Sequence, residues 1–139
     1  MRFVFDENHP ALLADMLRPI GAAEGYEVES VESLELRGTK DVELLHRVCA
    51  NTAKGVLITT DRAMRRRHHE RAAVAASGAV VVVGVSNWNQ QSDLLHRARM
   101  MVWWWEQIRE GAAGADPGSF LELPWANTPR ALRRWRVKT

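Results

Sequence analysis

Residues 55–61 read GVLITTD, an apolar run that ends in two threonines and an aspartate. A run without alternating polar positions is typical of a strand covered on both faces, as in a parallel sheet. AVVVVGV at 79–85 and RFVF at 2–5 have the same character, so each is expected to be a buried strand. EVESV at 27–31 alternates polar and apolar residues, which predicts a strand nearer an edge.

The segments between these strands are expected to be helices, in which apolar residues recur at intervals of three or four. The first helix is expected over residues 10–20. The second follows Thr39 as its N-cap and stops before Gly55. An Arg-rich helix is expected over 62–77, and a long one over about 90–110.

Strands that alternate with helices predict an α/β fold, a three-layer α/β/α sandwich with a mainly parallel central sheet. FLEL at 120–123 and the region 133–137 are expected to add short strands. The 139 residues contain no linker long enough to divide them. We therefore interpret 1–139 as one domain, with a basic tail over about 126–139.

Two of the expected helices carry apolar faces that are predicted to be buried. On the second and the last helix these faces comprise Val42, Leu45, Val48, Cys49, Leu94, Leu95, Ala98, Met101, Val102, Trp105 and Ile108. Trp103, Trp104 and Trp105 follow one another and therefore spread over more than half of a helix circumference. At least one of them is expected to face a partner helix, a second subunit or solvent.

Charge is segregated along the chain, although the net charge is only +2. Residues 1–45 carry ten Asp and Glu against four Lys and Arg, whereas residues 46–139 carry fifteen Lys and Arg against seven Asp and Glu. An acidic half beside a basic half suits a protein that binds cations and a polyanion, and a solvated charged surface is the simpler alternative. The basic residues gather in two groups: Arg62, Arg65, Arg66, Arg67 and Arg71, then Arg130, Arg133, Arg134, Arg136 and Lys138.

Cysteine content and hydropathy favour a cytoplasmic location. The single cysteine, Cys49, cannot form an internal disulfide. Asp6 and Glu7 interrupt the first apolar run after three residues, so the N-terminus does not resemble a secretory signal. No apolar run approaches the ~20 residues that span a bilayer.

Acidic residues follow two of the expected strands directly. Asp6 and Glu7 come after the first strand, Asp61 follows GVLITT, and Asp41 lies in the first turn of the second helix. Because the carboxyl ends of parallel strands meet at one edge of a sheet, these side chains are expected to converge. Clustered carboxylates suit Mg²⁺ or Mn²⁺, which relieves their mutual repulsion. A metal held in this way can activate water against a phosphodiester.

Each of these acids also has a simpler explanation. Asp6, Asp41 and Asp61 could each cap a helix or favour its dipole. Asn8 is expected to cap the helix that Pro10 begins. The convergence of three acids favours a metal site over capping alone.

The order and spacing of four segments resemble the PIN-like domain family, particularly its compact toxin-like members. These segments are FVFDEN (3–8), RGTKDVELL (37–45), LITTDRAMRRRHHERAA (57–73) and FLELPW (120–125). The resemblance covers nearly the whole chain and implies a Mg²⁺- or Mn²⁺-dependent ribonuclease. It also implies the toxin role of a type II toxin–antitoxin pair, with RNA as substrate and an antitoxin as partner. Such toxins commonly form homodimers, for which Trp104 is expected to be available.

Carried over position by position, the resemblance implies that Asp6, Asp41 and Asp61 are the catalytic residues and metal ligands. Glu7 and Asn8 are implied to support or orient the site, and Glu7 is a further candidate ligand. Thr60 is implied to reach phosphate or a metal-bound water.

Arg62, Arg65 and Arg66 follow Asp61 and are expected at the rim of the same cleft, where they could bind RNA phosphates. A solvated helix face is the alternative. Many PIN-like domains place a further acid within a few residues of the Asp61 position. Here the next acid is Glu70, which the sequence places a helix or more away.

Two other classes of function share some of these sequence features. One is a catalytically inactive PIN-like module that binds RNA or protein. The other is a receiver-type phosphorylation domain, which also has an acid pair after its first strand and an Asp after its third. A receiver needs a lysine after its last strand, and no Lys occurs between Lys54 and Lys138. The sequence therefore disfavours the receiver.

Overall fold

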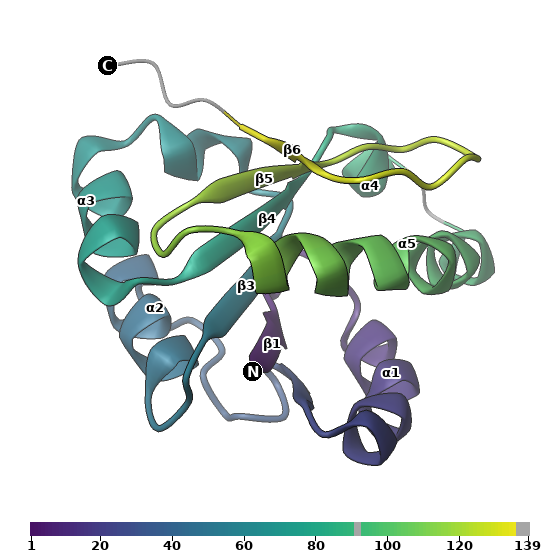
Figure 1. Cartoon of the computed structure of the whole chain (residues 1–139), viewed down its shortest axis with the longest axis horizontal. Helices are drawn as coiled ribbons and strands as arrows, with labels where there is room; N and C mark the ends of the chain where they lie inside the picture. Colours follow the sequence, from purple (N-terminus) through teal and green to yellow (C-terminus); the bar gives the residue numbers. More distant parts are fainter. Residues whose placement is uncertain (91–92, 136–139) are drawn as a thin grey trace.

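The computed structural model describes residues 1–90 and 93–135, which form a six-stranded sheet with helices on both faces (Figure 1). The strand order is β2-β1-β3-β4-β5-β6. The neighbours from β2 to β5 are parallel, and β6 is antiparallel to β5. The strands are β1 (Arg2–Phe5), β2 (Glu27–Ser30), β3 (Gly55–Thr59), β4 (Val80–Gly84), β5 (Phe120–Leu123) and β6 (Arg133–Arg134).

Helices cover the two faces of the sheet in pairs. Since side chains alternate along a strand, α1 and α5 pack on the face that carries Phe3 and Phe5, and α2 and α3 on the face that carries Val4 and Val81. This arrangement confirms the predicted three-layer sandwich with a mainly parallel sheet. The helices are α1 (Ala11–Glu24), α2 (Asp41–Cys49), the 3₁₀ turn η1 (Arg62–Arg65), α3 (His68–Ser77), α4 (Asn87–Gln90) and α5 (Leu94–Gly114).

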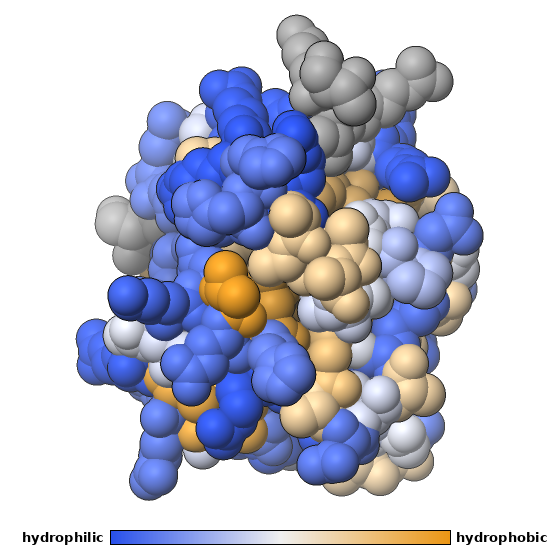
Figure 2. All heavy atoms as spheres, turned by 90° about the vertical axis from the view of Figure 1, so that its left-hand side faces the viewer, coloured by the Kyte–Doolittle hydropathy of each residue, from blue (hydrophilic) through white to orange (hydrophobic). Residues whose placement is uncertain are grey.

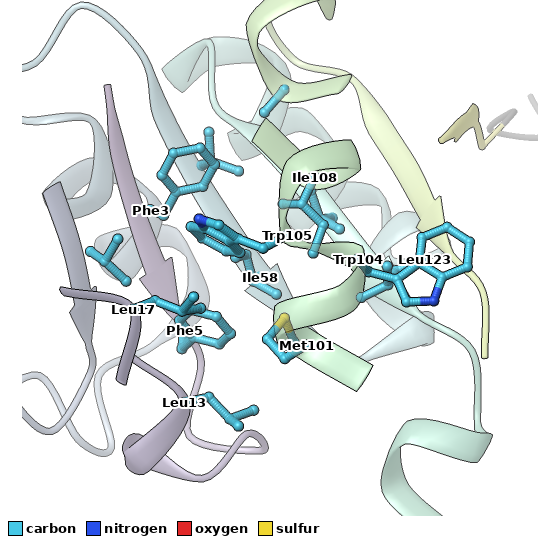
Figure 3. Packing of buried hydrophobic residues seen from close by; sticks show 14 of the residues in the cluster. Phe3, Phe5, Leu13, Leu17, Ile58, Met101, Trp104, Trp105, Ile108 and Leu123 are labelled. Atoms are coloured by element: carbon cyan, nitrogen blue, oxygen red, sulfur yellow. The ribbon is translucent and has the colours of Figure 1, made fainter. Parts of the chain in front are cut away.

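Aromatic side chains fix β1 against α5 (Figure 3). The Trp105 ring centroid lies 4.9 Å from that of Phe3 and 6.0 Å from that of Phe5, with the second pair nearly parallel. The Trp105 indole N–H donates to the Tyr26 hydroxyl at 2.9 Å, so its one polar atom is satisfied. Because β1 is held in this way, the position of its carboxyl end is well defined.

The helix over residues 10–20 continues for one turn more than the sequence predicts. The last residue of α1 is Glu24, and Gly25 follows as its C-cap with a φ of 88°, which suits glycine. Gly21 is not a helix stop but a point of close approach, because a Cβ there would lie 2.7 Å from the Tyr26 carbonyl oxygen.

Other predicted helix boundaries are also corrected. The segment 62–77 is two helices, since η1 gives way to α3 at His68. The helix predicted over about 90–110 is α5, which runs from Leu94 to Gly114, and the short helix α4 precedes it. Lys40 rather than Thr39 occupies the N-cap of α2, and its side chain makes no capping hydrogen bond. Turns that break a helix by backbone geometry leave little trace in hydrophobic spacing.

Four residues that were predicted to be buried are exposed. Their exposed fractions are 42% for Leu94, 60% for Leu95, 48% for Val102 and 50% for Val42. The apolar faces of α2 and α5 are wider than the strips that contact the sheet, so their flanks remain outside. Figure 2 looks onto the α2–α3 side and shows a small apolar patch within a mainly hydrophilic face.

The three consecutive tryptophans separate as their spacing requires. Trp105 and Trp104 are buried, and Trp103 is 53% exposed, which confirms that at least one faces outward. The Trp104 indole N–H donates to the Ala126 carbonyl at 2.9 Å. The expectation that Trp104 is available to a partner is therefore wrong, because its ring belongs to the core.

The final strand is shorter than the predicted region 133–137. Its described part is Arg133–Arg134, and the Trp135 backbone N–H donates to the Phe120 carbonyl at 2.7 Å. Arg136, Val137 and Lys138 lie outside the described residues. Within the described ranges, no helix has both the length and the apolar character that crossing a membrane requires.

Candidate metal centre

The predicted acids gather at a cleft beside the carboxyl ends of β1 and β3, which are neighbours in the centre of the sheet. The second strand lies on one side of β1, and the fourth lies on the far side of β3, so the strand order reverses here. Open parallel sheets bind ligands at such switch points. The cleft encloses about 350 Å³, and its polar lining includes Asp6, Glu7, Asn8, Asp41 and Asp61.

Asp6 is held rigidly at the end of β1. The Thr59 hydroxyl donates to Oδ2 at 2.9 Å, and the Glu7 backbone N–H donates to Oδ1 at 2.8 Å. The Asp6 backbone N–H donates to the Ile58 carbonyl at 2.9 Å, which continues the ladder between β1 and β3. Burial raises the pKa of Asp6, and the two hydrogen bonds to its carboxylate oppose that rise.

Thr59 connects three residues of the site, a role that the sequence did not reveal. Besides donating to Asp6, its hydroxyl accepts from Asn8 Nδ2 at 3.0 Å and from the Asp61 backbone N–H at 3.1 Å. Asn8 Oδ1 in turn accepts from the Thr60 backbone N–H at 3.0 Å. Asn8 therefore ties the end of β1 to the end of β3.

The prediction that Asn8 caps the first helix is wrong. Pro10 occupies the N-cap position of α1, and no side chain makes a capping hydrogen bond there. Both polar atoms of the Asn8 side-chain amide instead form hydrogen bonds at the end of β3, with the Thr59 hydroxyl and the Thr60 backbone N–H. Asn8 thus lines the cleft and joins the ends of β1 and β3.

Asp61 combines the two roles that the sequence left open. Its Oδ1 accepts from the Ala63 backbone N–H at 3.1 Å, so it caps η1. Its side chain also lines the cleft, together with Asp41 from the first turn of α2. Capping therefore fixes the Asp61 carboxylate without removing it from the site.

Glu70 joins the cluster, although the sequence placed it a helix or more away. One carboxylate oxygen from each of Asp41, Asp61 and Glu70 lies within 4.8 Å of the others. The break between η1 and α3 turns the chain back, so that Glu70 faces Asp61 across a short loop. A signal existed in the sequence: Glu70 precedes the buried Val74 by one helical turn, so it lies on the inner face of α3.

Crowding of these carboxylates perturbs Asp41. The pKa of Asp41 is raised to about 6, first by burial and then by the charge and hydrogen bond of the neighbouring Glu70. The charges of Asp6 and Asp61 contribute in the same direction. Such mutual repulsion is relieved by a proton or a cation.

Arg67 is the basic side chain that meets the cluster. Its guanidinium lies 2.6 Å from Glu70 Oε1, 3.2 Å from Asp61 Oδ2 and 3.6 Å from Asp41 Oδ2. These ion pairs raise the pKa of Arg67 further. From the sequence, Arg67 was recognised only as a member of a basic group, because its contacts with the acids depend on the turn before α3.

Of the other predicted site residues, Glu7 lines the cleft, whereas Thr60 and the three arginines are not among its lining residues. Glu7 is exposed. The Thr60 hydroxyl donates to Asn89 Oδ1 of α4 at 2.8 Å. The guanidinium carbons of Arg62 and Arg65 lie 5.6 and 4.1 Å from the ring centroid of Trp135, and Arg66 is exposed.

The donor set fits a divalent cation. Its three close carboxylates offer oxygen ligands of the kind that Mg²⁺ and Mn²⁺ prefer. Glu70 Oε2 is buried and has no hydrogen-bond partner in the described part of the chain, as expected for an atom that awaits a ligand. The pKa of Asp41 is raised by burial first and then by the neighbouring carboxylates, whose repulsion a cation would relieve.

Comparison with known proteins gives one family match. A family model described as a PIN like domain matches residues 1–86. This range contains Asp6, Asp41, Asp61 and Glu70, and it ends just after β4. No curated protein and no solved structure matches the chain.

Proposed function

The chain belongs to the PIN-like domain family, and we propose that it hydrolyses phosphodiester bonds in RNA with Mg²⁺ or Mn²⁺. PIN-like domains are generally metal-dependent nucleases. One observation carries the proposal for this chain: Asp6 and Asp61, just after β1 and β3, line one cleft with Asp41 of α2, and Glu70 of α3 lies close to Asp41 and Asp61. The family match alone would leave open whether the site is intact.

The acids divide the work in this proposal. Asp41, Asp61 and Glu70 hold the cation, since their oxygens are close enough to share it. Asp6 completes the negative field, because its charge interacts with both Asp41 and Asp61. When bound, the metal activates water and neutralises charge that develops on the phosphate.

Basic residues that follow Asp61 in the sequence support a nucleic acid as substrate. A cluster of carboxylates repels phosphate, so a polyanion needs cations nearby. Arg62 and Arg66 are exposed, and the guanidinium groups of Arg62 and Arg65 lie over the Trp135 ring. We assign phosphate binding to these three arginines, as expected from their place after β3.

We further propose that the protein is the toxin of a cytoplasmic type II toxin–antitoxin pair. The resemblance to compact toxin-like members supports this role, and it implies a cognate antitoxin and a homodimer as assemblies. Exposed Leu95, Val102 and Trp103 line an apolar groove with Met16, which supports a protein partner of some kind. Co-expression with the product of an adjacent small gene, followed by co-purification, tests the antitoxin.

Cleavage of a labelled single-stranded RNA tests the nuclease. Purified protein is assayed with Mn²⁺ or Mg²⁺, with and without EDTA, beside Asp61→Asn and Asp116→Asn variants. The second variant is a matched control, because Asp116 is 80% exposed and precedes β5 at the opposite edge of the sheet. We expect EDTA to abolish cleavage and Asp61→Asn to lower it by more than about 100-fold.

The same assay distinguishes the alternative, an inactive module that binds RNA or protein. Equal cleavage by Asp61→Asn and the wild type would refute the assigned site. Retained RNA binding without any metal-dependent cleavage would favour the binding module instead.

A further inference from the structure

Arg67 forms ion pairs with three carboxylates, contacts that the proposed nuclease activity does not require. One nitrogen of its guanidinium contacts Glu70 and Asp41, at 2.6 and 3.6 Å, while the other contacts both oxygens of Asp61 at 3.2 Å. The same three carboxylates form the candidate cation site. One positive group of the chain itself therefore balances all three.

A guanidinium and a divalent ion compete for these carboxylates. Mg²⁺ and Mn²⁺ bind carboxylate oxygens at roughly 2.0–2.2 Å, closer than any hydrogen-bond donor approaches. Asp41, Asp61 and Glu70 each offer an oxygen within 4.8 Å of the others, and the Arg67 guanidinium contacts all three carboxylates. The positive charge of Arg67, held on the same carboxylates, would repel an incoming ion.

The position of Arg67 in the chain allows its side chain to leave. Its backbone forms the N-cap of α3, and its side chain is 42% exposed, so the guanidinium can swing into solvent without opening the core. Glu70, by contrast, has a side chain that is only 6% exposed and stays in place. The Arg67 guanidinium can therefore leave while the Glu70 carboxylate stays in place.

We propose that Arg67 is the resident counter-ion of the metal-free site and that a divalent ion displaces it. Metal entry and release of Arg67 from the carboxylates are then one event. The inference rests on the proposed function for the statement that a metal binds here, but it concerns binding and not cleavage.

Direct titration with Mn²⁺, followed by electron paramagnetic resonance of the free ion, tests this idea. We expect Arg67→Gln to bind Mn²⁺ roughly five- to tenfold more tightly than the wild type, the range given by loss of two or three partly exposed ion pairs. Arg67→Lys keeps the charge without the planar fork and should lie between the two. Arg134→Gln is the matched control: it removes the same charge from a side chain that is 67% exposed and pairs with Asp116 instead of the three carboxylates.

Thermal unfolding provides a second readout that a purely structural role would not give. In EDTA, Arg67→Gln should melt below the wild type, because the carboxylates lose their counter-ion. In saturating Mn²⁺ the difference should vanish, since the metal has then displaced Arg67 in the wild type as well. A melting difference that persists in Mn²⁺ would show that Arg67 stays in place and would overturn the proposal.

Failure of this inference is distinguishable from failure of the nuclease. Tighter Mn²⁺ binding by Arg67→Gln supports displacement even if no RNA is cleaved. Equal or weaker binding by that variant overturns it, even if cleavage is robust. Absence of Mn²⁺ binding by both proteins would overturn it together with the metal site.

Discussion

The two sides of the acid cleft are built differently. On the strand side, Asp6 is 8% exposed and is joined to Asn8 and to Asp61 through hydrogen bonds of Thr59. On the helix side, the charges of Asp41 and Glu70 repel each other, and both carboxylates form ion pairs with Arg67. The strand side is fixed before any ligand arrives, whereas the helix side is balanced by charge and can readjust.

The difference follows from how each element is anchored. The β1 and β3 strands exchange ladder hydrogen bonds with each other and with strands on either side, and every residue of β3 is buried. The α2 and α3 helices share no ladder hydrogen bonds with the sheet and pack on it through side chains, and Asp41 and Glu70 lie in their first turns. A rigid side beside an adjustable side allows a cation to be accepted without rebuilding the sheet.

Removing Glu70 should have the largest effect and would break the comparison most directly. Glu70→Gln keeps the size of the side chain but removes a charged ligand from the helix side. We expect RNA cleavage to fall by more than about 100-fold, beyond the roughly 10- to 100-fold cost of changes outside the ligand set. The measurement is initial cleavage rate at saturating Mn²⁺, with Glu110→Gln on α5 as control. Full activity would mean that the helix side only supports the fold.

Thr59→Val tests the rigidity of the strand side. It leaves Asp6 Oδ2, Asn8 Nδ2 and the Asp61 N–H without their shared partner. We expect the free energy of unfolding, measured by urea titration in EDTA, to fall by roughly 1–3 kcal/mol.

Thr60→Val is the matched control for that substitution. Thr60 is equally buried, but its hydroxyl donates one hydrogen bond, to Asn89. Its loss should cost only about 0.5–1.5 kcal/mol. Equal costs at the two positions would show that the Thr59 connections add nothing beyond a single bond.

The strand side was also the part that sequence could predict. GVLITTD and RFVFDEN each show an apolar run followed at once by an acid. The rule that parallel strands present their carboxyl ends together then places Asp6 and Asp61 at one cleft. Local pattern and a general topological rule were sufficient there.

The helix side depends on geometry that local pattern does not record. Glu70 and Arg67 reach Asp61 only because the chain turns between η1 and α3, and the sequence predicted one continuous helix there. Thr59 reads as an ordinary strand residue until its three partners are placed around it. Asn8 looked like a helix cap because Pro10 follows closely, yet the competing partners on β3 are distant in sequence.

Acid should weaken metal binding through the helix side. The pKa of Asp41 is about 6 in the folded, metal-free protein, against an ordinary value of 3.8. Because a ligand must lose its proton to bind, Mn²⁺ affinity should be about tenfold lower at pH 5 than at pH 7. Titration of Mn²⁺ at several pH values measures this, and Asp41→Asn should flatten the dependence of whatever binding remains.

The stability of the metal-free protein should change with pH in the opposite sense. A folded-state pKa above the unfolded value means that the folded state holds its proton more tightly. This contribution is fully present below about pH 4 and is lost as pH rises through about 6. The raised pKa of Asp6 acts in the same direction. Urea titrations in EDTA that show no such loss for the wild type relative to Asp41→Asn would contradict the repulsion on the helix side.

The smallest expected effect comes from capping α2, which sharpens the contrast between the two sides. Lys40 occupies the N-cap with an extended backbone (φ −63°, ψ 146°) but offers no acceptor, and Glu43 already stands at the third helical position. Lys40→Ser would complete a capping box and should raise the free energy of unfolding in EDTA by about 0.5–1 kcal/mol over Lys40→Ala, which removes the same charge. If the helix side adjusts through side chains, Mn²⁺ affinity should be the same in both variants. A tighter site in Lys40→Ser would instead mean that fraying of α2 limits metal binding, so that the mobility of this side lies in the backbone around Asp41.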